Sequence, residues 1–210
     1  MPLPVRAGGS KATSYSHDQD ADQYNAFTKM EAEYFISEYL FGRVLGKGFH
    51  GVISLATRKS DGKKVAYKSI PKSNVYRYAL ESIPPPRCHL RNPLVPSEKP
   101  SVVQCMSPRP PNLPFPYEFA LQTYLSRPGY ENPYVPRALD YIILKDKYIL
   151  VMDYLGEDWV NLAKYVEKKG PLDIETARDI IREIVNGMIY LKQYGILHGD
   201  LDGMSQWAIL

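Results

Sequence analysis

Gly46-Lys47-Gly48-Phe49-His50-Gly51 is the stretch that decides the fold, because strand patterns lie directly before and after it. Before the glycines, Tyr39–Leu45 is predicted as a strand. After them, Val52–Thr57 is rich in β-branched residues and alternates in polarity, which is typical of a second strand. Ser60-Asp61-Gly62 supplies a hairpin turn, and Lys64–Ile70 returns as a third strand. The sequence therefore predicts a meander in which the glycines join two strands.

Glycines at this spacing occur in two nucleotide-binding arrangements. In a dinucleotide-binding fold they end a strand and open a helix, and an acidic residue follows about 20 positions later. Here a strand follows the glycines, and the residue about 17 positions after Gly51 is the cation Lys68. The context favours a flexible hairpin laid over a triphosphate, because glycines let the backbone approach phosphates without Cβ clashes. Phe49, at the tip, would shield the γ-phosphate from solvent.

Lys68 ends the tetrapeptide Val65-Ala66-Tyr67-Lys68, which matches the Val-Ala-Ile-Lys pattern of protein kinases. On these motifs the chain resembles the eukaryotic-type serine/threonine protein kinases, in particular the PIM and PAS types. The resemblance implies that Lys68 meets the α- and β-phosphates of ATP. It also implies that Glu118, in a helix that starts near Pro116, holds this lysine in place. The alternative for Glu118 is a solvated surface glutamate.

The resemblance further implies that Leu150–Leu155 forms the strand and hinge that bind adenine. Met152 would be the gatekeeper, and the backbone of Asp153 and Leu155 would hydrogen-bond the base. The ATP-binding residues expected on this basis are Leu45, Gly46, Lys47, Gly48, Phe49, Gly51, Ile53, Ala66, Lys68, Met152, Asp153 and Leu155.

A second motif, Ile196-Leu197-His198-Gly199-Asp200-Leu201, resembles the catalytic loop of the same family. It comes after Asp173–Tyr194, where apolar residues at steps of three and four predict an amphipathic helix. In the family the aspartate of this loop accepts the proton of the substrate hydroxyl, and this role would fall to Asp200. The alternative is a core histidine beside a surface aspartate. The expected catalytic residues are Asp200, Lys68 and Glu118.

The pattern departs from the family after Leu201. Gly199 stands where the family has an arginine, and Ser205 stands where it has a magnesium-binding asparagine. No Asp-Phe-Gly motif is found between Ser205 and Leu210. ATP and Mg²⁺ are the cofactors that the resemblance implies, but the magnesium ligands are not identifiable and no metal site is assigned. We expect a truncated kinase domain, or one with a misjoined exon, that transfers phosphate weakly or not at all. The alternative is a non-catalytic, kinase-derived module for nucleotide binding or regulatory interaction.

The expected fold class is α+β and protein-kinase-like, with an antiparallel five-stranded small lobe and the first helices of the large lobe. Residues 1–37 are expected to be a disordered leader, because the first residues lack a hydrophobic period. Residues 38–155 would form the small lobe, and residues 156–210 an incomplete large lobe. A proline-rich insertion is expected over residues 75–115, since proline removes backbone donors from any ladder.

The remaining small-lobe elements are also predicted from pattern. A short helix near Pro116 should bury Ala120, Leu121 and Leu125, and Arg137–Leu144 with Tyr148–Met152 should form a second hairpin.

The bulk composition is that of an ordinary globular domain, with 210 residues, 44% of them hydrophobic and 23% charged. The net charge of +3 gives no reason to expect nucleic acid as a partner. No stretch approaches the roughly 18 apolar residues that cross a bilayer, so no membrane partner is expected. The two cysteines lack metal-site spacing, which favours an intracellular location, cytoplasmic or nuclear. The expected partners are ATP, a protein substrate, and a protein or second copy bound through the apolar face of residues 173–194.

Overall fold

The computed structural model describes residues 3–7, 18–48, 51–81, 109–130, 133–157 and 162–197. The chain divides into two compact units. The larger unit comprises Pro4–Glu131 and Arg137–Tyr154, and the smaller one comprises Met1–Leu3, Asn132–Pro136 and Leu155–Leu210.

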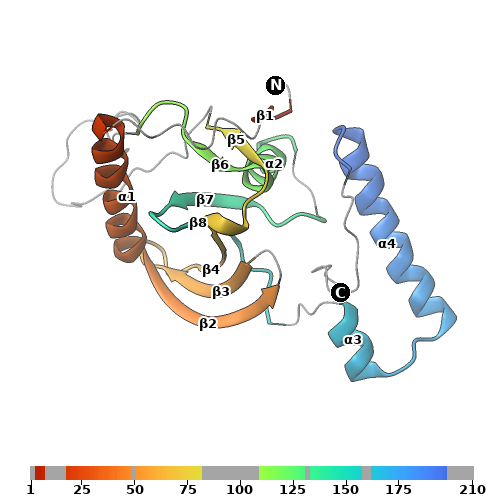
Figure 1. Ribbon diagram of the computed structural model, residues 1–210. Helices are drawn as coiled ribbons and strands as arrows, with labels where there is room; N and C mark the ends of the chain where they lie inside the picture. The colour runs from red at the N-terminus through yellow and green to blue at the C-terminus, as the bar shows by residue number, and fades with distance from the viewer. Residues whose placement is uncertain are drawn as a thin grey trace. The chain divides into compact units, whose positions relative to one another are not determined.

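A five-stranded antiparallel sheet, in the order β2-β3-β4-β8-β7, forms the centre of the larger unit (Figure 1). Its strands are β2 (Tyr39–Gly48), β3 (Gly51–Arg58), β4 (Lys64–Pro71), β7 (Ala138–Ile143) and β8 (Lys147–Asp153). The predicted meander and the second hairpin are both confirmed, and so is the α+β class with a five-stranded antiparallel sheet. The alternation of β-branched residues and the turn at Gly62, whose φ is +70°, are local signals that required no distant partner.

Each face of the sheet carries its own core, because successive side chains of a strand point to opposite faces. On one face Ala66, Leu150 and Met152 are buried in a cluster that includes Phe119 and Ala120 of α2 (Tyr117–Leu125). Val65, Ile149 and Val151 are buried in a cluster on the other face. The predicted helix near Pro116 is confirmed as α2, where Ala120 and Leu125 are buried while Leu121 is half-buried.

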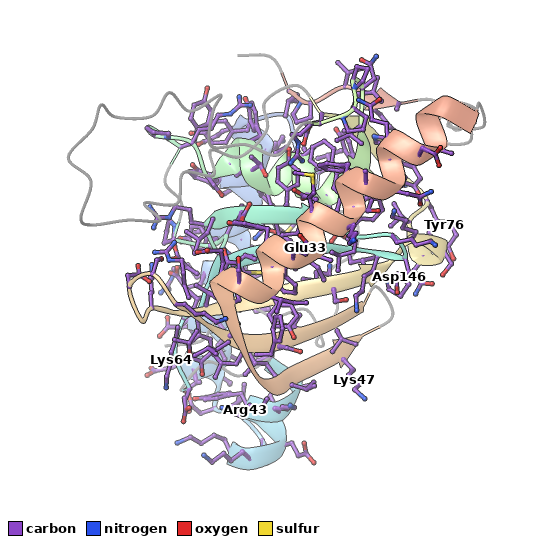
Figure 2. All side chains as sticks on the ribbon, turned by 90° about the vertical axis from the view of Figure 1, so that its left-hand side faces the viewer. Glu33, Arg43, Lys47, Lys64, Tyr76 and Asp146 are labelled. Atoms are coloured by element: carbon purple, nitrogen blue, oxygen red, sulfur yellow. The ribbon has the colours of Figure 1, made fainter. Side chains whose placement is uncertain are left out.

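Helix α1 (Asp18–Glu38) corrects the prediction of a disordered leader over residues 1–37 from residue 18 onward, while residues 8–17 lie outside the described residues. The side chains of Phe27, Glu31 and Phe35 are 1%, 0% and 7% exposed, and their spacing of four places them on one helical face. Phe27 joins one core and Phe35 the other. Figure 2 shows α1 lying across the strands on the viewer's side. The sequence pattern did not indicate this helix, because its buried face contains a glutamate.

A second, three-stranded sheet corrects the prediction of a proline-rich insertion over residues 75–115 at its two ends, while residues 82–108 lie outside the described residues. Its strands are β1 (Arg6–Ala7), β5 (Tyr78–Leu80) and β6 (Pro114–Pro116), in the order β1-β5-β6. All three residues of β6 are buried, so this end of the expected insertion is not a surface loop.

The prolines of β6 fit the ladder because they alternate with residues that make the hydrogen bonds. The N–H of Glu81 donates to the carbonyl of Leu113 at 2.8 Å, and the N–H of Tyr117 donates to that of Arg77 at 2.9 Å. Pro114 and Pro116 occupy the intervening positions of an edge strand, where no backbone donor is required.

The smaller unit contains α3 (Leu162–Lys169) and α4 (Ile174–Gln193). The predicted helix Asp173–Tyr194 is confirmed in its bounds: the side chain of Asp173 accepts a hydrogen bond from the N–H of Thr176 at 2.8 Å. Gly195 follows with a φ of +71°, as expected after a helix end. Of the apolar side chains predicted on one face, Leu191 is buried, whereas Ile181 and Met188 are 56% and 41% exposed. Among the helices within the described ranges, none has the length and apolar character to span a membrane.

Candidate functional site

The structure brings Lys68 and Glu118 together. Lys68 lies in the middle of β4, opposite Ile53 of β3 and Leu150 of β8. Its Nζ is 2.8 Å from Oε1 of Glu118, and the two side chains are 24% and 44% exposed. This is the pair that the resemblance to protein kinases implied. A partly exposed ammonium group held at a fixed position on a sheet is suited to binding a phosphate group.

Helix α2 supplies Glu118 in its first turn, as the second residue after the cap residue Pro116. Proline is well suited to this place, because its fixed φ and missing N–H do not disturb the start of a helix. A carboxylate in the first turn also interacts favourably with the helix dipole. Glu118 is therefore compatible with its position for local reasons, and its side chain remains available to Lys68.

The glycine-rich segment closes the β2–β3 hairpin, where Gly48 pairs with Gly51. Gly51 has a φ of +139°, and a Cβ there would lie 2.3 Å from the carbonyl oxygen of Ser69, so the fold itself requires this glycine. A Cβ at Gly48 would meet no described atom within 4 Å. The space beside Gly48 is open, which leaves room for a ligand to approach the backbone. Lys47 is exposed on the same strand.

The apolar residues expected around adenine also lie together. Leu45 and Ile53 are partly buried and pack in the same cluster as Ala66 and Met152, which are both 7% exposed. Ala66 is directly opposite Met152 in the β4–β8 register.

Gln122 also belongs to this region, although no motif in the sequence pointed to it. Its Nε2 lies 3.8 Å from Sδ of Met152. Gln122 follows Glu118 by one helical turn, so the two side chains share a face of α2. The spacing of four from Glu118 was the signal that could have identified it.

The expected hinge residues are divided between the two units. The N–H of Asp153 donates to the carbonyl of Arg137 at 3.0 Å, so any contact of this residue with a base falls to its carbonyl oxygen. The carboxylate of Asp153 pairs with Lys63 at 2.7 Å and with Arg137 at 3.2 Å. Leu155 belongs to the smaller unit and is 38% exposed.

Two of the predicted site residues, Phe49 and Asp200, lie outside the described residues. Ser205 lies outside them as well. Within the described ranges, the His, Cys, Asp and Glu side chains form no group of three or more that could hold a metal ion. The described residues thus provide a cation for phosphate but no carboxylate cluster for magnesium.

Two cavities of about 330 and 440 Å³ lie beside α1, away from the Lys68–Glu118 pair. The larger is lined by Ser54, Tyr67 and Ser69 of the sheet, together with apolar side chains of α1. These three alternate along their strands with Ile53, Ala66 and Lys68, so the cavity is on the opposite face of the sheet. The candidate site is the region around the partly exposed Lys68–Glu118 pair, and these cavities are separate from it.

Comparison with known proteins gives curated relatives that are named as protein kinases. No family model matches the chain. Serine/threonine-protein kinase pim-2 of Danio rerio is 25% identical over 174 residues, which are 80% of this chain and 47% of the relative. Protein kinase kin1 of Schizosaccharomyces pombe is 24% identical over 95% of this chain and 20% of the relative. Serine/threonine-protein kinase GRIK2 of Arabidopsis thaliana is 26% identical over 79% of this chain and 33% of the relative.

The chain spans less than half of the length of these relatives. The aligned part nonetheless covers most of this chain, and the structure has the five-stranded antiparallel sheet that the family resemblance implied. The matches extend well beyond the glycine-rich segment and the Val65–Lys68 motif. On this evidence the chain is related to the serine/threonine protein kinases.

Proposed function

We propose that the larger unit is the ATP-binding small lobe of a serine/threonine protein kinase, and that its role is to hold the nucleotide for phosphoryl transfer to a protein. The observation that carries the proposal is the ion pair between Lys68 and Glu118 at 2.8 Å. It joins two elements, β4 and α2, that are far apart in the chain. Relatives named as serine/threonine kinases support the same function.

The proposed role of Lys68 is to bind the α- and β-phosphates, while Glu118 fixes the direction of its side chain. In protein kinases both members of this pair must be in place for activity. Gly46, Gly48 and Gly51 would face the phosphates. The base would lie against Leu45, Ile53 and Ala66, in front of Met152. These assignments are proposals that rest on the clustering of the side chains and on the resemblance.

The proposed catalytic base is Asp200, and Mg²⁺ is the expected metal. When bound, magnesium would neutralise charge on the transferred phosphoryl group. Only Lys68 and Glu118 of the proposed catalytic residues are among the described ones, so nucleotide binding is the part of the proposal that this structure supports most directly.

The test is a titration of a fluorescent ATP analogue into the wild-type chain, Lys68→Met and Lys64→Met. Lys64 is an exposed lysine at the start of the same strand, so it is a matched control for charge and chemistry. A charge-assisted contact contributes about 1.5–3 kcal/mol, so we expect Lys68→Met to weaken binding by roughly 10- to 100-fold. Lys64→Met should remain within about twofold of wild type. The same affinity for all three proteins would contradict the proposal.

A further inference from the structure

A buried ion cluster, hereafter the Arg109 cluster, is formed by Glu31, Glu81 and Arg109. The guanidinium of Arg109 binds Glu81 through two nitrogens, with Nε 2.8 Å from Oε2 and Nη2 2.5 Å from Oε1. Its Nη1 lies 3.4 Å from Oε1 of Glu31. The side chains of Arg109, Glu81 and Glu31 are 8%, 6% and 0% exposed. One arginine thus holds two carboxylates away from solvent.

The neighbours of the Arg109 cluster are arranged to support its charges. The hydroxyl of Tyr141 donates to Oε1 of Glu81 at 2.5 Å, and the N–H of Ile143 donates to Oε2 of Glu31 at 3.2 Å. The rings of Phe27 and Tyr141 lie 5.0 and 5.7 Å from the guanidinium carbon, within cation–π range. Elements α1 and β7 are therefore joined to Arg109 from several directions.

A short, well-packed path leads from Arg109 to Glu118. Leu113 is fully buried, and the ring of Phe115 stacks on Tyr141 with centroids 5.0 Å apart. The hydroxyl of Tyr148 donates to the carbonyl of Pro114 at 3.2 Å. Helix α2 begins three residues after Pro114, at Tyr117, and Glu118 is the second residue of that helix. The segment that leads into β6 and α2 is thus anchored by Arg109, five residues before the strand begins.

We propose that Arg109, together with Glu31 and Glu81, is a positioning group that holds the start of α2 where Glu118 meets Lys68. The inference rests on the proposed function of the Lys68–Glu118 pair and adds a means of controlling it. Since Glu31 belongs to α1, docking of α1 becomes a condition for the pair to form. A protein that binds a ligand only in one conformation loses apparent affinity in proportion to the loss of that conformation.

Arg109→Lys is the informative substitution, because lysine keeps the charge but lacks the planar fork that reaches both carboxylates. Arg58→Lys is the matched control: Arg58 makes an ion pair with Asp61 in the exposed β3–β4 turn, and its Nε lies 3.0 Å from Oδ1. Glu31→Gln tests the α1 side of the cluster. Each variant is made in the wild-type chain and in a Glu118→Gln background.

The first readout is the rate of acetylation of Lys68 by acetic anhydride, divided by that of Lys64 and measured by peptide mass spectrometry. Acylation requires the reagent to reach the amine, and the contact with the Glu118 carboxylate shields Nζ of Lys68 from it. We expect Arg109→Lys and Glu31→Gln to raise this ratio about three- to tenfold, and Arg58→Lys to leave it unchanged. In the Glu118→Gln background, neither Arg109→Lys nor Glu31→Gln should change the ratio. General destabilisation would raise the ratio in the Glu118→Gln background as well, because it exposes Lys68 whether or not residue 118 carries a charge, whereas Lys64 is already exposed.

The second readout is the affinity for the fluorescent ATP analogue in the same set. Arg109→Lys should weaken binding about five- to tenfold in the wild-type background and less than twofold in the Glu118→Gln background. An unchanged Lys68:Lys64 ratio, or equal effects in both backgrounds, would overturn the inference. The acetylation ratio needs no nucleotide, so a failure of ATP binding itself would count against the proposed function and not against the positioning role.

Discussion

Two sets of ion pairs in the larger unit differ in their environment. The Arg109 cluster is almost entirely buried, whereas the side chains of Lys68 and Glu118 are 24% and 44% exposed. A buried pair depends on all of its members, because removing one leaves an uncompensated charge out of water. An exposed pair contributes little to stability. The buried cluster therefore has a structural reason to exist, whereas the Lys68–Glu118 pair needs a functional one.

The largest effect is expected from Arg109→Met. This substitution removes the guanidinium that binds both Glu31 and Glu81, and breaking a buried pair costs about 3–5 kcal/mol. The free energy of unfolding, measured by urea titration, should fall by that amount. Arg58→Met, which breaks an exposed pair, should lower it by less than about 1 kcal/mol. A loss for Arg109→Met no larger than that of the control would remove the distinction between the two environments.

Lys72 is an intermediate case between the buried and the exposed pairs. It lies in the short helix η1 (Lys72–Asn74), and its Nζ donates to the hydroxyl of Tyr24 and, at 2.9 Å, to the carbonyl of Lys145. The rings of Tyr24 and Tyr148 are 4.9 and 5.2 Å from it. Burial lowers the pKa of Lys72 from 10.5 to about 8, partly opposed by the charge of Asp146.

The pH dependence of stability should reveal this environment. Because the pKa of Lys72 is lower in the folded chain, the unfolded chain binds more protons between pH 8 and 10.5, and the free energy of unfolding rises with pH across that window. Partial exposure reduces the effect, so we expect a gain of about 1–2 kcal/mol between pH 7.5 and 9.5. Urea titrations at the two pH values should show this gain in wild type and not in Lys72→Met. Equal gains in both proteins would mean that Lys72 titrates normally.

The smallest effect on stability is expected from Glu118→Gln. The pair is partly exposed, so the free energy of unfolding should change by less than about 1 kcal/mol. The affinity for an ATP analogue should nevertheless fall about tenfold, because Lys68 is no longer held toward the phosphates. Both quantities are measured on the same preparation. A loss of stability as large as that of Arg109→Met would instead assign the pair a structural role.

The parts of the fold that were predicted correctly depend on neighbouring residues. The strands around Gly46–Gly51 follow from alternation and a turn, and α4 follows from its apolar spacing with Asp173 as its cap. The Lys68–Glu118 pair was indicated only by the family resemblance. The two residues come from elements that pattern alone does not place side by side.

The parts that were missed depend on distant partners. From the sequence alone, Glu31 has the character of a surface residue. In the fold it is buried because Arg109, 78 positions away, neutralises the charge of its carboxylate. From the sequence alone, the prolines of β6 argue against a strand. The pairing with β5 makes the strand possible, because it needs no hydrogen bond from the proline positions. Helix α1 and the three-stranded sheet are therefore products of tertiary contacts, which a local pattern does not contain.

The adjacency of Glu81 and Arg109 also bears on how the chain can change its length. These residues flank the segment 82–108, and their side chains meet within the Arg109 cluster. The ends of that segment are thus fastened to each other independently of what lies between them. Such a junction allows sequence to be inserted or removed while the strands that carry Lys68 and lead to Glu118 keep their register.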